Sequence, residues 1–168
     1  LHDALPIYCS LGKEPNILNE TPEHCRHIHL KHPILSNSDL HAIKNFEAEG
    51  FKTTVIDVLF EASGEDGELE KAIDRINLEA EEAVKNGTTI LVLSDRKVTT
   101  DKAQVPSLLA LASVHHHLIR QNLRADTSLV VESGDVRETH NFGTLIGYGA
   151  DAVNPYLVFE TIDRKSVV

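Results

Sequence analysis

The 168-residue chain has no methionine or tryptophan and only two cysteines, Cys9 and Cys25. Two cysteines do not make the disulfide framework of a small secreted domain, so we expect a reducing, cytosol-like compartment. No apolar run approaches the roughly 20 residues of a transmembrane helix, which argues against a membrane protein. Basic residues are also few, because 16 Lys and Arg stand against 26 Asp and Glu, a formal charge of −10. That balance argues against binding to nucleic acid or anionic lipid.

The two ends of the chain differ from the rest. Residues 1–7 and 163–168 can be encoded by one DNA string and its reverse complement, and that string resembles a sequencing-library adapter. We therefore expect both ends to be an artefact of DNA assembly and exclude them from fold reasoning. The length supports one domain or a piece of a larger one, and we expect residues 8–162 to be an internal fragment of a longer protein.

Hydrophobic periodicity predicts strands that alternate with helices after an irregular N-terminal segment at 8–37. In that segment Thr21 can cap a short helix, and residues 27–30 alternate like a short exposed strand. Residues 98–105 read as a polar loop. We expect strands at 53–60, 88–93, 128–131 and 150–153, and helices at 38–49 (capped by Ser38), 68–86, 106–122, 136–148 and from 156 onwards.

Strands joined by helices predict a parallel sheet that is covered on its faces. The stretch 128–155 shows the unit most clearly: a buried strand, a turn, a helix stopped by Gly149, and a second strand. Such a βαβ unit is right-handed and puts its strands parallel. The fold class is therefore α/β, either part of a (β/α) barrel or an open doubly wound sheet.

Function in parallel α/β folds sits at the carboxyl ends of the strands. Asp95 and Glu132 at these ends could form a carboxylate pair for acid–base work or metal binding, and Gly134 could let backbone N–H groups meet an anion. The alternative is structural: Asp95 and Arg96 pair with neighbouring loops, and Ser133 or Asp135 caps a helix. The residues at these strand ends are Glu61, Ser94, Asp95, Arg96, Glu132, Ser133, Gly134 and Asn154.

Two groups of histidines invite a metal interpretation. His115, His116 and His117 are consecutive, so on a helix they point about 100° apart and cannot close on one ion; one of them, His115, is better explained as a core histidine. The second group lacks the spacing of known zinc motifs, and a solvated loop is the default. It comprises His24, Cys25, His27, His29 and His32.

Several long motifs then occur in a characteristic order: LGKEPNILNETPEH at 11–24, LSNSDLHAI at 35–43, AEEAVKNGTTILVLSDRKV at 80–98, VPSLLALASVHHHLIRQNLR at 105–124, and a run at 129–162 that contains ETHNFGTLIGYGA. Together they closely resemble the central domain of the large chain of glutamate synthase. Members of that family usually carry ETHHFALLLGYGA at the last motif. The resemblance covers residues 11–162.

The resemblance implies a parent enzyme that makes two glutamates from glutamine and 2-oxoglutarate, with electrons from NADPH, NADH or reduced ferredoxin. An amidotransferase domain releases ammonia, and a synthase domain with FMN and an iron–sulfur cluster reduces the imine. The central domain resembles a degenerate FMN-binding barrel that joins these two domains and frames the ammonia route. The implied fold is a partial, barrel-like parallel sheet with flanking helices.

The resemblance transfers no catalytic, cofactor-binding or metal residue to this chain, since Cys9 and Cys25 match neither the nucleophile nor cluster ligands. It implies that the fragment alone is inactive and that its partners are the amidotransferase and synthase domains of its own chain, with a small NADPH-oxidising subunit or ferredoxin. It also implies a cytoplasmic location, or a plastid in a photosynthetic eukaryote. We expect interdomain or tunnel contacts at Ser94, Asp95, Arg96, Glu132, Ser133 and Asn154. The alternative is an independent α/β enzyme that uses Asp95 and Glu132.

Overall fold

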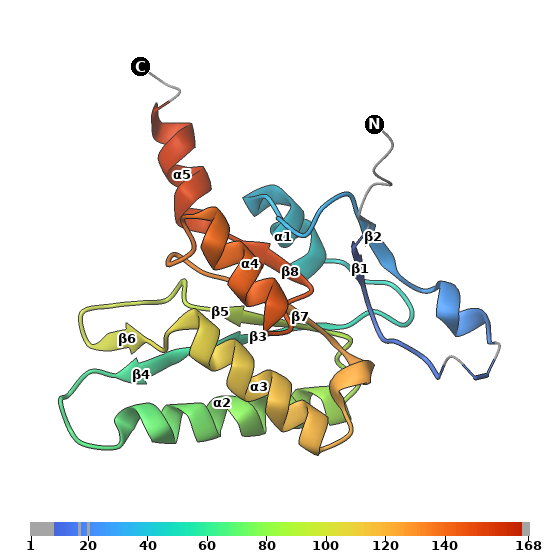
Figure 1. Ribbon diagram of the computed structural model, residues 1–168, viewed down its shortest axis with the longest axis horizontal. Coiled ribbons are helices and arrows are strands. Elements are labelled where there is room, and N and C mark those ends of the chain that lie inside the picture. The colour runs from blue at the N-terminus through green and yellow to red at the C-terminus, as the bar shows by residue number, and fades with distance from the viewer. Residues whose placement is uncertain (1–8, 17, 20, 166–168) are drawn as a thin grey trace.

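A four-stranded parallel sheet forms the centre of the molecule, in the order β3-β5-β7-β8 (Figure 1). The computed structural model describes residues 9–16, 18–19 and 21–165. The strands are β3 (Thr53–Asp57), β5 (Ile90–Ser94), β7 (Ser128–Glu132) and β8 (Ala152–Asn154). This arrangement confirms the predicted parallel α/β fold. In the described residues β3 and β8 are the outer strands of an open sheet, so the barrel-like part of the expectation is not confirmed.

The two central strands are apolar along their whole length because both faces of the sheet are covered. Every residue of β5 and β7 is buried. Side chains alternate between the faces, so Leu91 and Leu93 enter one hydrophobic cluster, whereas Ile90 and Val92 enter the other. The continuous apolar runs seen in the sequence are therefore explained by two cores on opposite sides of one sheet.

Helices cover the two faces unequally (Figure 1). One face packs against α2 (Glu68–Lys85), α3 (Ser107–Arg120) and α4 (Thr139–Gly147), which supply the larger cluster. The other face packs against α1 (Asn37–Lys44) and the N-terminal segment, and its cluster includes Leu11, Leu35 and Leu40. The last helix, α5 (Tyr156–Lys165), follows β8. It includes residues 163–165 of the C-terminal end that the sequence predicts to be an artefact; residues 1–7 and 166–168 lie outside the described residues.

The predicted strand at 53–60 is wrong as a single element. The chain leaves the parallel sheet at Val58, whose N–H donates to the Ser94 carbonyl at 2.9 Å. Beyond it, β4 (Leu59–Glu61) pairs antiparallel with β6 (Lys102–Gln104), so the polar loop predicted at 98–105 contains a strand. The sequence shows no apolar run at β6 because its residues are exposed or only partly buried.

Two predicted helix boundaries were also wrong, because capping residues rather than the apolar pattern decide where these helices start. Helix α1 starts at Asn37 because Ser36 and Asp39 form a reciprocal capping box, and it ends at Lys44 rather than at residue 49. Helix α4 starts at Thr139 rather than at 136, since Val136 is buried in the preceding turn.

The N-terminal segment is less irregular than predicted. Strands β1 (Cys9–Leu11) and β2 (Ile28–Leu30) pair antiparallel, and the short 3-10 helix η1 (Pro22–Cys25) lies between them in sequence. Further on, Leu35 N–H donates to the Val153 carbonyl at 2.9 Å, and Val153 N–H donates to the Pro33 carbonyl at 2.8 Å. This part of the chain thus runs parallel to β8 and covers that edge of the sheet.

No helix in the described part of the chain is both long and apolar enough to cross a membrane.

Candidate functional site

The predicted strand-end residues meet at the carboxyl edge of the sheet. In register, Ser94 at the end of β5 lies beside Glu132 at the end of β7, which lies beside Asn154 at the end of β8. Parallel strands that end in register bring such residues together whatever their separation in sequence. The carboxyl-edge cluster is Ser94, Asp95, Arg96, Glu132, Ser133 and Asn154.

Glu132 is the centre of one half of the cluster. Its carboxylate is only 4% exposed. One oxygen, Oε2, accepts hydrogen bonds from Lys44 Nζ and from Ser94 Oγ, both at 2.6 Å. The other, Oε1, accepts from Arg96 Nε at 3.1 Å. Two cations and a hydroxyl compensate the burial of this charge, so Glu132 ties the end of α1 to the sheet.

Arg96 extends the same network to α5. Its Nη2 donates to Glu160 at 3.0 Å, and its guanidinium lies 4.5 Å from the ring centre of Tyr156. The Arg96 side chain is 42% exposed, in contrast to the buried carboxylate that it contacts. A cation over an aromatic ring is weakly attractive, and with Glu160 it fixes the start of α5 against the sheet.

Asp95 is the centre of the other half. Its side chain accepts from Ser133 Oγ at 2.6 Å and from Gly134 N–H at 3.1 Å, and the residue is 1% exposed. Burial raises the pKa of Asp95, and the hydrogen bonds from Ser133, Tyr156 and Gly134 counteract that rise. Burial, followed by the charge of Asp95, raises the pKa of Tyr156 in turn. The anion that Gly134 was predicted to meet is therefore the chain's own aspartate.

The turn after β7 leaves no room for a side chain at Gly134. A Cβ atom there would lie 2.6 Å from Leu157 Cδ1.

Asn154 anchors the end of β8 to the segment before α1 and to its first residue. Its Nδ2 donates to the Leu35 carbonyl at 2.8 Å and to Asn37 Oδ1 at 3.0 Å. Its Oδ1 is buried with no hydrogen-bond partner among the described residues. The carboxyl edge is therefore packed against α1 and α5.

Asp95 and Glu132 do not act as a carboxylate pair in this geometry. Their side chains bond to different partners, and the link between the two residues is a backbone hydrogen bond, from Asp95 N–H to the Glu132 carbonyl at 3.2 Å. Both carboxylates are engaged by internal donors, which favours the structural interpretation that the sequence left open. No group of three or more His, Cys, Asp or Glu in the described ranges is arranged to hold a metal ion.

The consecutive histidines diverge, as the helix geometry predicted. His117 Nε2 pairs with Glu81 on α2 at 2.6 Å, whereas His115 Nδ1 accepts from Arg124 Nε at 3.0 Å. His115 is half-buried, and burial lowers its pKa. In the other group, His24 bonds to Thr21 and to the Asn16 carbonyl. His117 thus links α3 to α2, His115 contacts the segment that follows α3, and His24 bonds within the N-terminal segment. Each of these contacts is structural.

Sequence reasoning missed Lys44, Tyr156 and Glu160, three members of the carboxyl-edge network. Lys44 lies 88 residues from Glu132, and nothing local to α1 marks it as the partner of a buried carboxylate. Tyr156 follows Asn154-Pro155 directly, and its position two residues after the end of β8 could have indicated it.

The fold and the site together define a class: an open parallel α/β domain whose strand-end polar groups brace its own helices. Comparison with known families makes the assignment specific. The family model described as glutamate synthase central domain matches residues 3–167. The chain belongs to the glutamate synthase central domain family, which confirms the resemblance drawn from its motifs.

Relatives with different electron donors in their names match nearly the whole chain. It is 42% identical over 155 residues to the glutamate synthase [NADPH] large chain of Bacillus subtilis, covering 92% of this chain and 10% of the relative. It is 37% identical over 166 residues to glutamate synthase [NADH] of Saccharomyces cerevisiae, covering 98% and 8%. It is 41% identical over 161 residues to the chloroplastic ferredoxin-dependent enzyme of Spinacia oleracea, covering 94% and 10%. The chain spans about a tenth of these relatives' length.

Proposed function

We propose that this chain is the connecting domain of a glutamate synthase that converts glutamine and 2-oxoglutarate into two glutamates. The observation that carries the proposal is the match of the central-domain family model to residues 3–167, together with relatives that are all named glutamate synthases. In this proposal the amidotransferase and synthase domains of the same parent chain are its partners. A small NADPH-oxidising subunit or ferredoxin supplies the electrons to the parent enzyme. The parent works in the cytoplasm, or in a plastid if the source is a photosynthetic eukaryote.

The cofactors of that parent enzyme are assigned to its other domains. Iron–sulfur clusters are held by about four cysteine thiolates, and this chain has two cysteines, so its residues do not fit a cluster. Barrels bind phosphate through donors at the carboxyl ends of their strands. Here the Gly134 N–H bonds to Asp95, so this strand end does not fit the phosphate of FMN. In this proposal the domain therefore contributes no chemical step of its own.

The carboxyl-edge cluster is proposed as the side of the domain that faces its neighbours. Arg96 is the partly exposed member and can contact another domain directly. The other members are buried, so their contribution is to hold the loops after β5, β7 and β8 in place. Fixed loops at this edge would help to frame a route for ammonia between the amidotransferase and synthase domains.

A stand-alone enzyme based on Asp95 and Glu132 is less well supported. A general acid or base has to reach a substrate proton, and both side chains are at least 96% buried and bonded internally. Purified chain offers a direct comparison of the two functions. We expect no bound flavin and no release of ammonia from glutamine; a flavin spectrum at stoichiometric ratio would overturn the connecting-domain proposal.

The connecting role itself is tested in the full-length parent enzyme with Arg96→Ala. We expect glutamine-dependent glutamate synthesis to fall, while ammonia-dependent synthesis and glutamine hydrolysis, each measured alone, stay unchanged. Lys97→Ala is the matched control, since Lys97 is the next residue and 73% exposed. Equal rates for Arg96→Ala and the unmodified enzyme in all three assays would contradict the proposed role of Arg96.

A further inference from the structure

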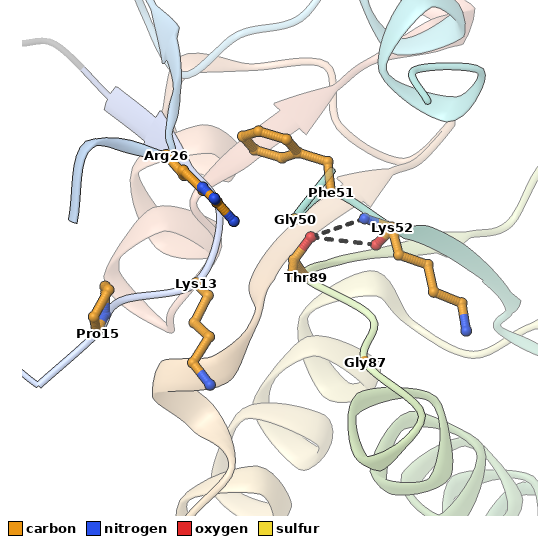
Figure 2. Close-up of a pocket in the computed structure, with 8 residues that line it drawn as sticks. All are labelled: Lys13, Pro15, Arg26, Gly50, Phe51, Lys52, Gly87 and Thr89. Atoms are coloured by element: carbon orange, nitrogen blue, oxygen red, sulfur yellow. Dashed lines mark hydrogen bonds between the residues drawn. The ribbon is translucent and has the colours of Figure 1, made fainter. Parts of the chain in front are cut away.

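A basic pocket opens at the amino edge of the sheet, where the chain enters β3 and β5. It has a volume of about 310 Å³. Figure 2 shows Lys13 and Arg26, from the N-terminal segment, across from the loops that precede β3 and β5. The pocket is lined by Lys13, Pro15, Arg26, Gly50, Phe51, Lys52, Gly87 and Thr89.

Hydrogen bonds hold the floor of the basic pocket in place. Lys52 N–H donates to Thr89 Oγ1 at 3.0 Å, and Thr89 Oγ1 donates to the Lys52 carbonyl at 3.5 Å (Figure 2). Thr89 N–H also donates to the Lys52 carbonyl, at 2.9 Å. The wall that carries Lys13 is anchored on both sides of that residue. Gly12 N–H donates to Ser128 Oγ at 3.0 Å, and Glu14 N–H donates to the Ala125 carbonyl at 2.8 Å. The walls are therefore positioned before any ligand arrives, which lowers the entropic cost of binding.

The lining is cationic in a chain that carries a net charge of −10. Lys13, Arg26 and Lys52 come from three separate segments, and no carboxylate lines the pocket in the part of the chain that the structure describes. A local concentration of positive charge attracts small anions, whereas the acidic surface around it repels extended polyanions.

Each of these cations retains donors for a ligand. Lys13 pairs with Asp126 at 2.7 Å, and Lys52 Nζ donates to the neutral Asn86 carbonyl at 3.0 Å. Arg26 has a carboxylate, that of Glu49, only at 3.9 Å, and that side chain is 90% exposed. A lysine has three N–H donors and an arginine has five, so these single contacts leave most of them available.

Two glycines keep the space open. Gly50 and Gly87 have φ values of +87° and +86°, a conformation that other residues rarely adopt. A Cβ atom at Gly50 would lie 3.3 Å from Arg26 Cδ and Nη1, and at Gly87 it would meet nothing within 4 Å. Gly50 therefore lets the Arg26 guanidinium lie close to the loop before β3, and Gly87 leaves the loop before β5 without a side chain at that position.

We propose that the basic pocket binds a small organic anion that carries two or more negative charges on carboxylate or phosphate groups. The planar fork of Arg26 matches either group in bidentate fashion, and Lys13 adds a point charge. The Lys52 ammonium is directed away from these two cations, towards the Asn86 carbonyl (Figure 2), so Lys52 lines the pocket near Thr89. Pro15 and Phe51 provide an apolar wall for a short carbon skeleton. The volume lies at the lower end of small-molecule sites, which suits a ligand of few atoms. This site goes beyond the proposed connecting function and does not depend on it.

The test is a titration of the 168-residue chain with citrate and with pyrophosphate at constant ionic strength, followed by calorimetry and by backbone amide NMR. We expect at least one probe to bind with saturation, to raise the melting temperature, and to shift the amides of Gly50, Gly87 and Thr89. The two probes separate a carboxylate site from a phosphate site. No saturable binding of either probe would overturn the proposal.

Variants separate a site from general attraction of anions. Arg26→Gln is expected to weaken binding about tenfold or more, because charge-assisted hydrogen bonds are lost. Arg120→Gln removes the same charge from an exposed position on α3 and is expected to leave binding unchanged. Arg26→Lys keeps the charge and should bind with intermediate affinity. Circular dichroism and the melt without ligand check that each variant folds, and equal weakening by Arg26→Gln and Arg120→Gln would contradict the site.

Discussion

The two edges of the central sheet treat charge in opposite ways. At the carboxyl edge, buried carboxylates of Glu132 and Asp95 are surrounded by donors from the chain itself. At the amino edge, the charged residues that line the basic pocket are cations, the side chains of Lys13 and Arg26 are 53% and 46% exposed, and glycine loops leave space beside them. A buried ion without a partner is costly, whereas an exposed ion costs little. The carboxyl edge therefore contributes to stability, whereas the amino edge is free to bind a ligand.

The largest expected effect comes from removing the central acceptor of the carboxyl edge. Glu132→Ala should lower the free energy of unfolding by about 2 to 3 kcal/mol, because Lys44, Arg96 and Ser94 lose their shared partner. This is below the usual cost for a fully buried pair, since both cations reach water. Urea unfolding measures it. Glu160→Gln, at the exposed end of the network, should cost under about 1 kcal/mol. Equal losses for the two variants would break the distinction between buried and exposed charge.

Glycine-to-alanine substitutions compare the space at the two edges. Gly134→Ala should cost about 2 kcal/mol, since its Cβ would clash with Leu157. Gly87→Ala has open space but a positive φ, and should cost about 1 kcal/mol. Gly143→Ala within α4 is the control, because nothing lies within 4 Å and alanine favours a helix; it should stabilise by about 0.5 kcal/mol. Thermal melts rank the three, and a smaller loss at Gly134 than at Gly87 would contradict the close packing of the carboxyl edge.

The pH dependence of stability isolates the buried charge of Asp95. Because the folded-state pKa of Asp95 is raised above its ordinary value of 3.8, its contribution is fully present below that value. It is lost as the pH rises through the folded pKa, where the buried side chain ionises. The stability of the unmodified chain relative to Asp95→Asn should therefore decline from pH 3.5 towards neutrality.

Denaturant unfolding of both proteins at matched pH values measures that decline. Asp151 also has a pKa raised by burial, so it tilts the pH profile of both proteins in the same direction and cancels in the difference. A difference that stays constant over the pH range would rule out a raised pKa at Asp95.

The smallest effects are expected at the amino edge. Lys13→Gln and Arg26→Gln should each change the free energy of unfolding by under about 0.5 kcal/mol in the absence of ligand, because their ion pairs are exposed to solvent. Added salt should reduce these differences further, because it screens exposed charges. A loss above about 1 kcal/mol in either variant, measured by urea unfolding, would show that the basic pocket supports the fold.

The carboxyl-edge residues could be predicted from the sequence because each of them directly follows or ends a recognisable apolar strand. Two apolar runs, β5 and β7, end in polar residues, and parallel pairing then brings Ser94 beside Glu132. It failed for Lys44, whose contact depends on how α1 packs, and for β6, whose short polar strand is stabilised by pairing with β4. Helix α4 was placed too early because the apolar Val136 fills the turn rather than a helix face.

The basic pocket had no counterpart in the sequence for a related reason. Its three cations lie at positions 13, 26 and 52, and no stretch around any of them is strongly basic. The net charge of −10 argued only against binding to nucleic acid or anionic lipid, and a total charge does not describe the field at one pocket. Only the fold places an N-terminal loop beside the starts of β3 and β5.

The pairing of residues 33–35 with β8 has a consequence for how the molecule forms. That contact and the neighbouring bond from Asn154 to the Leu35 carbonyl join groups 119 residues apart. Such a contact closes a loop of most of the chain, and the entropy of closure is lost before the contact can compensate it. High contact order slows folding, so residues 33–35 should dock last, onto a sheet that is already assembled. Until it docks, β8 is an uncovered strand edge and the nascent domain is open to association with other chains.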